Sequence, residues 1–310
     1  MGRLRLGAMI PNDISAEVEF ALRAHDDRPA IVEVQPMVGG CIHPSACLRT
    51  ASGGRAFLKW GRSMGPAGFR AEVDGLRALS RASGPRTPTI LGFQPGQPAS
   101  RGWILLEFIR AGVQRADSAK RLGSALARLH RPLPESVPGW DRDGFIGVLL
   151  QPNRAEGAHW PEFWREKRLA TQWQKARGHF SKSGHRDWHQ LMELVGPALS
   201  ACENDGLSLL HGDLWHGNVI TDWTGDPVLI DPAVYRGHRE VDLAMMELFG
   251  GFPAEVFEGY ESQTAVSEEY REFRRDVYQL YPLLVHVNLF GRAYVGAVRD
   301  RVRRLLRTLG

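Results

Sequence analysis

The alternation of apolar and polar residues divides the chain into a strand-rich first third and a helix-rich remainder. Five short apolar runs, separated by glycine-bearing turns and loops, predict strands at Ile31–Val34, Cys47–Thr50, Ala56–Trp60, Ile90–Phe93 and Trp103–Ile109. Residues 13–25 and 69–82 carry apolar positions at helical spacing, and the second helix falls between the third and fourth strands. The pattern predicts a small antiparallel sheet with one helix inserted after its third strand.

Beyond Ala111 the pattern becomes mainly helical. Ser118 is a candidate helix cap, and Pro132 is expected to stop that helix. A loop rich in proline, glycine and tryptophan follows over residues 132–161, and helical spacing returns at 162–177 and 186–202. Pro282, inside the longest late apolar stretch, is expected to break or kink a helix. We therefore predict an α+β fold of two lobes, residues 1–110 and 111–310, which meet near Glu107–Gly112.

Composition narrows the functional classes. The 310 residues carry a net charge of +4, and the arginines near the C-terminus lie at helical spacing, which favours a solvated helix face over a nucleic-acid surface. Three cysteines, Cys41, Cys47 and Cys202, do not suggest a disulfide framework. The sequence contains no apolar run of membrane-spanning length and no apolar signal-peptide core, so a cytoplasmic protein that binds neither membrane nor nucleic acid is expected.

The segment from His211 to Asp231 concentrates the candidate chemistry. Asp213 precedes Asn218 by five residues, and two short apolar runs then flank a turn, Asp222–Pro227, as in a hairpin. A hairpin brings its ends together, so Asn218 and Asp231 are expected to lie side by side, with Asp213 one tight loop away. Two carboxylates and an amide would then converge.

Hard oxygen ligands of this kind suit Mg²⁺ rather than zinc. Phosphoryl transfer needs one carboxylate to orient the attacking hydroxyl, and a carboxylate with an amide to hold metal on the phosphates. The segment therefore predicts an ATP- and Mg²⁺-dependent transferase.

A lysine and a glutamate in the first lobe fit the same chemistry. Lys59 ends an apolar strand and can present its ammonium to phosphates, and Glu72 on the following helix can pair with it. Gly39 and Gly40 precede that strand and can form a flap whose N–H groups approach phosphate. Cys41 follows them, either as a small turn residue or as a redox-sensitive thiol.

A competing metal site would use His211, Asp213 and His216. Their spacing does not place three ligands on one helix face, and the sequence lacks an open zinc-site motif. A metal-dependent hydrolase built on these residues is therefore the weaker interpretation.

The motifs resemble those of fructosamine (ketosamine) kinases, in the protein-kinase-like group that includes aminoglycoside and choline kinases. The resemblance rests on H-G-D-L-W-x-G-N, on V-L-I-D-P-A-V-Y-x-G-H-R-E-x-D-L-A-M, and on L-F-G-G-F-P. Shorter matches extend from about residue 30 to the end, among them V-G-G-C-I, F-L-K, D-G-F-I-G and Y-P-L-L-V-H-V-N-L-F-G.

The resemblance implies a protein-kinase-like fold, and it implies a role for each matched residue. Asp213 would be the catalytic base, and Asn218 and Asp231 would bind metal. Lys59 would hold the ATP phosphates, and Glu72 would pair with Lys59. The backbone of Glu107, Phe108 and Ile109 would recognise the adenine base of ATP. The reaction implied is transfer of the γ-phosphate to the C3 hydroxyl of a ketosamine on a free or protein-bound amine. The unstable product would then release the amine.

Two departures and several substrate candidates remain open. His43-Pro44-Ser45 replaces the usual continuation of the glycine loop, and His216 stands where small polar residues are common. Trp215 is a candidate to pack on the substrate, or to anchor its loop. Further candidates are polar residues of a late helix, His286 and Asn288, and residues of the Pro/Gly-rich loop, Phe145, Gln151 and Trp160.

Two further functions stay open on the sequence alone. A kinase of the same fold could act on an aminoglycoside or an amino alcohol such as choline. A non-catalytic nucleotide-binding scaffold is the second, although Lys59, Asp213, Asn218 and Asp231 are all intact.

Overall fold

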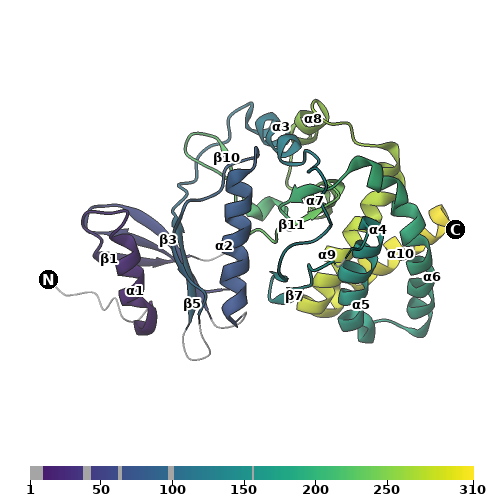
Figure 1. Ribbon diagram of the computed structural model, residues 1–310, viewed down its shortest axis with the longest axis horizontal. Helices are drawn as coiled ribbons and strands as arrows, with labels where there is room; N and C mark the ends of the chain where they lie inside the picture. Colours follow the sequence, from purple (N-terminus) through teal and green to yellow (C-terminus); the bar gives the residue numbers. More distant parts are fainter. Residues whose placement is uncertain (1–9, 38–42, 62–64, 97–100, 156) are drawn as a thin grey trace.

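The computed structural model describes residues 10–37, 43–61, 65–96, 101–155 and 157–310. The first part is a five-stranded antiparallel sheet in the order β1-β2-β3-β5-β4 (Figure 1). Its strands are β1 (Ile31–Pro36), β2 (Ser45–Thr50), β3 (Arg55–Gly61), β4 (Ile90–Gln94) and β5 (Gly102–Glu107). All five predicted strands are present. The predicted glycine flap, Gly39 and Gly40, and Cys41 lie outside the described residues.

Each face of the sheet is covered by a helix. Helix α1 (Asn12–Leu22) lies on one face and α2 (Gly65–Arg81) on the other (Figure 1). Side chains of β5 alternate between the two: Trp103 and Leu105 join the α1 cluster, whereas Ile104 and Leu106 join the α2 cluster. This explains the unbroken apolar run of β5, because both of its faces are buried.

The remainder is mostly helical and contains the larger core. Its helices are α3 (Ser118–Leu129), α4 (Trp160–Phe163), α5 (Thr171–Ala176), α6 (Lys182–Leu199), α7 (Glu240–Leu248), α8 (Ala254–Glu261), α9 (Arg275–Phe290) and α10 (Val295–Leu309). A π-helical segment, Trp164–Ala170, joins α4 to α5. The predicted fold class, α+β with a β-rich first part, is confirmed by this arrangement; the boundary at residue 110 stays a prediction.

Helices α3 and α8 approach closely because each contributes a glycine. A Cβ on Gly123 would lie 1.9 Å from the carbonyl oxygen of Val256, and one on Gly259 would lie 2.3 Å from that of Lys120. Backbone therefore packs against backbone at this crossing, which no larger residue permits.

Three features differ from the sequence prediction. Helix α9 runs through Pro282 without a break; most of its residues are buried, and that packing outweighs the loss of one backbone hydrogen bond. The loop at 132–161 contains a hairpin, β6 (Gly144–Ile146) and β7 (Leu149–Gln151). A second unpredicted pair, β8 (Ser208–Leu210) with β11 (Tyr235–Gly237), flanks the segment that carries Asp213.

Backbone hydrogen bonds join the sheet to the helical part. The hairpin of β9 (Val219–Thr221) and β10 (Pro227–Leu229) makes two of these hydrogen bonds, one as donor and one as acceptor. Leu229 N donates to Arg86 O at 2.9 Å, and Gly112 N donates to Thr221 O at 3.0 Å. The hairpin is thereby fixed to the segments before β4 and after β5.

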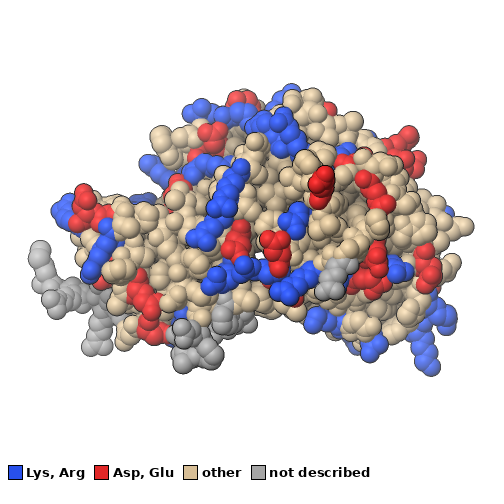
Figure 2. All heavy atoms as spheres, viewed as in Figure 1, with Lys and Arg blue, Asp and Glu red and all other residues tan. Residues whose placement is uncertain are grey.

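Charge is mixed on the molecular surface. Figure 2 shows Lys and Arg side chains interspersed with Asp and Glu on the face it draws. The C-terminal arginines lie on amphipathic α10, as predicted; among them, Arg304 pairs with Asp276 and Arg301 donates to Gln279. No described helix is long and apolar enough to cross a membrane.

Candidate active site

The β9–β10 hairpin places the predicted residues as its sequence suggests. Val219 pairs with Leu229, and Ile230 N donates to Asn218 O at 3.0 Å, so Asn218 and Asp231 lie at the same end. The turn is closed by Asp222, whose Oδ1 accepts hydrogen bonds from the backbone N–H of Thr224 and Asp226. A polar turn between two short apolar runs is sufficient to specify this geometry.

Asp213 lies against Asn218. The Nδ2 of Asn218 donates to Asp213 O at 2.8 Å and to Asp213 Oδ2 at 3.1 Å. Desolvation at the cavity wall raises the pKa of the Asp213 carboxyl to about 7; the hydrogen bond from Asn218 opposes this shift, and the charges of Asp231 and Asp242 add to it. A carboxyl group with such a pKa is suited to accept a proton near neutrality.

Asp242, on α7, holds the backbone that precedes Asp213. Its buried carboxylate accepts hydrogen bonds from His211 N at 2.7 Å and Gly212 N at 2.9 Å, and it contacts His130 Nε2 at 3.2 Å. Burial opposes its ionisation, but these partners lower the pKa of Asp242 below its ordinary value. The residue was not singled out from sequence, although it is the Asp of the quoted R-E-x-D-L-A-M run.

Gly212 makes the tight approach before Asp213 possible. Its φ of +80° is in the left-handed region, and a Cβ there would lie 2.1 Å from the carbonyl oxygen of Ala233. Position 212 therefore requires glycine for both conformation and space.

Lys59, Glu72 and Asp231 form one ion-pair network. Lys59 is on central strand β3, and its Nζ lies 2.9 Å from Glu72 Oε1 on α2 and 2.7 Å from Asp231 Oδ1. The predicted pairing of Lys59 with Glu72 is present. Asp231 has a φ of +53°, an uncommon conformation for a residue other than glycine, as is often found at functional sites.

These groups share a cavity that encloses about 900 Å³, counting its open mouth. Seven candidate residues singled out from the sequence line it: Lys59, Glu72, Phe145, Asp213, Trp215, Asn218 and Asp231. His43 also lines it, and burial lowers the pKa of its imidazole, with the charge of Lys59 contributing.

A further part of the cavity lining comes from the loop that contains β6. Trp140, Asn153 and residues 142–147 line the cavity. Phe145 is thus the one of the three loop candidates that reaches it. Gln151 is buried and donates to Ala233 O, and Trp160 packs in the helical core. This loop is attached to segments far along the chain, through hydrogen bonds between Gly139 and Arg236 and between Gln151 and Ala233, which local patterns do not reveal.

Glu107 is the last residue of β5, Phe108 and Ile109 follow it, and none of the three lines this cavity. The Glu107 side chain accepts hydrogen bonds from the Arg86 guanidinium at 3.1–3.2 Å and from Thr89. Arg55 lies over the Phe108 ring. The Glu107 side chain therefore holds Arg86 and Thr89 of the first part, and the adenine role of its backbone stays a prediction.

His286 and Asn288 also do not line the cavity. His286 packs among the rings of Phe249, Phe290 and Tyr294, and its Nδ1 contacts Pro282 O at 2.7 Å. Asn288 donates to Gln172 Oε1 at 2.8 Å. The structure thus gives both residues packing or hydrogen-bonding partners in the helical part and does not bring them to Asp213.

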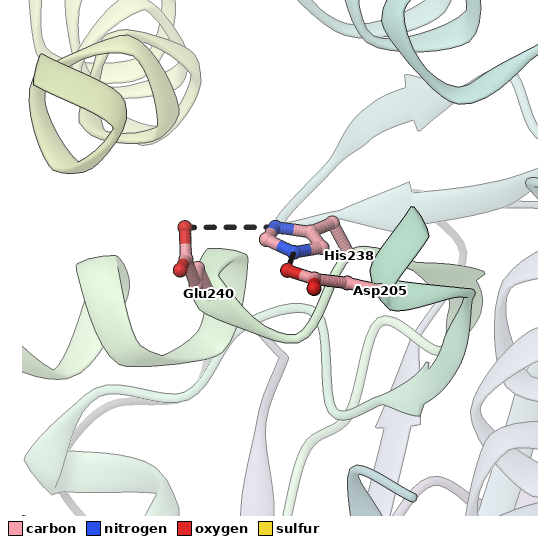
Figure 3. A group of neighbouring side chains, drawn as sticks. All are labelled: Asp205, His238 and Glu240. Carbon is pink, nitrogen blue, oxygen red and sulfur yellow. Dashed lines mark hydrogen bonds and ion pairs between the residues drawn. The ribbon is translucent and has the colours of Figure 1, made fainter. Parts of the chain in front are cut away.

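The histidines of the hydrolase alternative do not assemble a metal site. His211 Nε2 contacts Ile230 O at 2.9 Å, and its Nδ1 accepts from Asp213 N. The exposed His216 packs against Phe252. Within the described residues, the one cluster with metal-ligand spacing is Asp205, His238 and Glu240 (Figure 3).

The carboxylate of Glu240 in that cluster is already paired with a cation, the side chain of Arg274. Arg274 donates to both carboxylate oxygens of Glu240, each at 2.8 Å, while His238 lies between Asp205 and Glu240 (Figure 3). Both oxygens of Glu240 are thus engaged by an arginine, which favours a structural ion-pair network over a metal site.

Known proteins place this site in a family. The family model described as fructosamine kinase matches residues 14–308. A candidate ketoamine kinase of Synechocystis is 35% identical over 89% of this chain and 91% of its own, and the chloroplastic protein-ribulosamine 3-kinase of Arabidopsis thaliana is 35% identical over 90% and 84%.

Solved structures agree with the sequence matches. The crystal structure of a candidate fructosamine-3-kinase from Thermobifida fusca is 31% identical, covers 94% of this chain and 98% of its own, and superposes with a TM-score of 0.78. A macrolide 2'-phosphotransferase, 16% identical with a TM-score of 0.58, shares the fold alone. The predicted protein-kinase-like fold and the motif resemblance are both confirmed: the chain belongs to the fructosamine kinase family.

Proposed function

We propose that this protein is an ATP-dependent kinase that phosphorylates the C3 hydroxyl of ketosamines of the ribulosamine and fructosamine type. The observation that carries the proposal is the convergence of Lys59, Asp213, Asn218 and Asp231 on one cavity, in a chain of the fructosamine kinase family. The printed names of its relatives, ketoamine kinase and protein-ribulosamine 3-kinase, support the same substrate class.

In this proposal Lys59 binds the ATP phosphates. Its stem lies in β3 and its ammonium is held by Glu72, which fixes the position of the charge before phosphate arrives. Gly39 and Gly40 would cover the phosphates, and the backbone of Glu107, Phe108 and Ile109 would contact adenine.

The donor groups of Asn218 and Asp231 fit a magnesium ion. The amide nitrogen of Asn218 is turned to Asp213, so its oxygen is the atom left for a metal, and Asp231 adds a carboxylate. Oxygen ligands of this type match Mg²⁺. When bound, the ion would neutralise charge on the phosphates.

Asp213 is proposed as the base. Its carboxylate would accept a hydrogen bond from the C3 hydroxyl and take its proton as the oxygen attacks the γ-phosphorus of ATP, with ADP leaving. Asn218 and the frame supplied by Asp242 hold the carboxylate in place. The 3-phosphate would decompose and free the amine, which would make the protein a cytoplasmic deglycation enzyme.

The test is ATP consumption measured in parallel with a ribulosamine, a fructosamine, an aminoglycoside and choline. Turnover of the ketosamines is expected. Phosphorylation of kanamycin or choline without turnover of either ketosamine would reject this substrate class in favour of another kinase of the fold. ATP binding without turnover of any acceptor would instead favour a nucleotide-binding scaffold.

A further inference from the structure

The loop that contains Asp143 and lines the cavity is fixed by a buried arginine. Arg168, 0% exposed, lies 4.0 Å from the ring of Tyr235 and 4.6 Å from that of Phe163. Its guanidinium donates to Pro152 O at 2.6 Å and to Asn153 Oδ1 at 2.7 Å. Burying a guanidinium is costly, and these contacts offset that cost while they immobilise the loop.

Asn153 connects Arg168 to the residues of the loop that line the cavity. Its backbone N donates to Asp143 Oδ1 at 2.8 Å, and its Nδ2 donates to Arg142 O at 3.3 Å. The carboxylate of Asp143 is therefore held on the cavity wall by a chain of hydrogen bonds that starts in the core. Among the described residues, the structure gives Asp143 Oδ2 no hydrogen bond or ion pair.

The other charged side chains that line the cavity form ion pairs or hydrogen bonds within the protein. Glu72 and Asp231 pair with Lys59, and Asp213 is bonded to Asn218. The neighbouring guanidinium of Arg142 pairs with Asp74 at 3.1 Å. Asp143 thus offers a carboxylate oxygen to a ligand in the cavity, on a loop whose position is set in advance.

A ketosamine carries a matching cation. Its amine is a secondary amine, largely protonated at neutral pH, and only C1 and C2 separate it from the C3 carbon. A carboxylate on the wall of the same cavity is therefore available to bind the ammonium while the hydroxyl faces Asp213. Building on the proposed function, we propose that the Asp143 carboxylate binds the protonated amine of the acceptor and selects amine-bearing acceptors over neutral sugars.

The experiment compares two acceptors that differ in one atom: an N-alkyl fructosamine, and the ether in which oxygen replaces the amine nitrogen. The wild type should prefer the amine in kcat/KM by about 10- to 100-fold, the usual effect of a charged hydrogen bond. Asp143→Asn should lose most of this preference through a higher KM for the amine, with kcat/KM for the ether nearly unchanged. Asparagine keeps an oxygen for Asn153 N, so the loop should stay in place.

Asp141→Asn is the matched control, because that exposed carboxylate of the same loop pairs with Arg236 at 3.3 Å and does not line the cavity. It should leave the preference intact. An unchanged amine preference in Asp143→Asn would overturn the proposal. So would a wild type that turns over amine and ether equally, a result that needs no variant to fold. A wild type that phosphorylates neither acceptor would reject the proposed function itself, and this proposal with it.

Discussion

The ammonium of Lys59 lies 2.7 Å from the carboxylate of Asp231, a residue 172 positions later in the chain. The pair joins the central strand of the sheet to the end of the β9–β10 hairpin. Because Glu72 holds the same ammonium from α2, three elements fix one charge. The proposed phosphate-binding and metal-binding groups are thus set relative to each other by direct contact.

Replacement of that lysine should mainly weaken the use of ATP. Lys59→Met removes a buried, hydrogen-bonded charge, so kcat/KM for ATP should fall on the order of 10²-fold. Steady-state kinetics at varied ATP measures the effect. Lys120→Met is the control, since Lys120 is an exposed lysine that pairs with Glu258 at 3.3 Å outside the cavity. Equal kinetics in the two variants would contradict the role of Lys59.

Asp213→Asn should impair the chemical step. Asparagine cannot take a proton from the acceptor hydroxyl, so kcat should fall by about 10²–10⁴-fold. ATP affinity, measured by calorimetry, should change little because the phosphate-binding groups remain. Turnover close to that of the wild type would remove Asp213 from the role of base.

Two glycine substitutions should have opposite effects on stability. Gly123→Ala introduces a Cβ against backbone of α8, so it should lower the free energy of unfolding by about 1–3 kcal/mol or more. Gly196→Ala, in α6, meets no atom within 4 Å and should raise it by about 0.5–1 kcal/mol. Chemical denaturation of both variants measures the difference, and equal effects would contradict the close packing of α3 and α8.

The His238–Asp205 pair should make stability depend on pH. Burial disfavours the charged imidazole, but the hydrogen bond to Asp205 and the nearby Cys202 and Glu240 together raise the pKa of His238. A raised pKa means that this stabilisation is complete below the unfolded value of about 6.5 and is lost as pH rises through the folded value.

Asp205→Asn should therefore lower the melting temperature more at about pH 6 than at about pH 9, by several degrees at the lower pH. The measurement is scanning calorimetry of both proteins at the two pH values. A difference in melting temperature that does not change with pH would show that the imidazolium does not contribute.

Local sequence was sufficient for much of the site. The hairpin that brings Asn218 beside Asp231 is specified by two apolar runs and the turn between them, and the Lys59–Glu72 pair follows from a strand and the next helix. These features depend on residues close together in the sequence, so hydrophobic periodicity and the residue types found in turns can predict them.

What sequence reasoning missed depends on distant contacts. Asp242 reaches His211 from a helix 31 positions later, and Asp143 reaches the cavity through Asn153 and Arg168. A break or a kink is expected from sequence at Pro282. The break is wrong because burial of α9 outweighs the local penalty of proline, and the kink stays a prediction. In each case tertiary packing, which one sequence does not display, decides the outcome.

The backbone hydrogen bonds at Arg86 and Gly112 have a mechanical consequence. They tie the β9–β10 hairpin to the chain before β4 and after β5, so this edge of the sheet is held to the helical part. Between α2 and the β6 loop, Arg142 and Asp74 form a partly exposed ion pair, which contributes at most about 1 kcal/mol. Separation of the sheet from the hairpin would break the backbone hydrogen bonds and the Lys59–Asp231 ion pair, whereas separation of α2 from the β6 loop would break a weak surface pair.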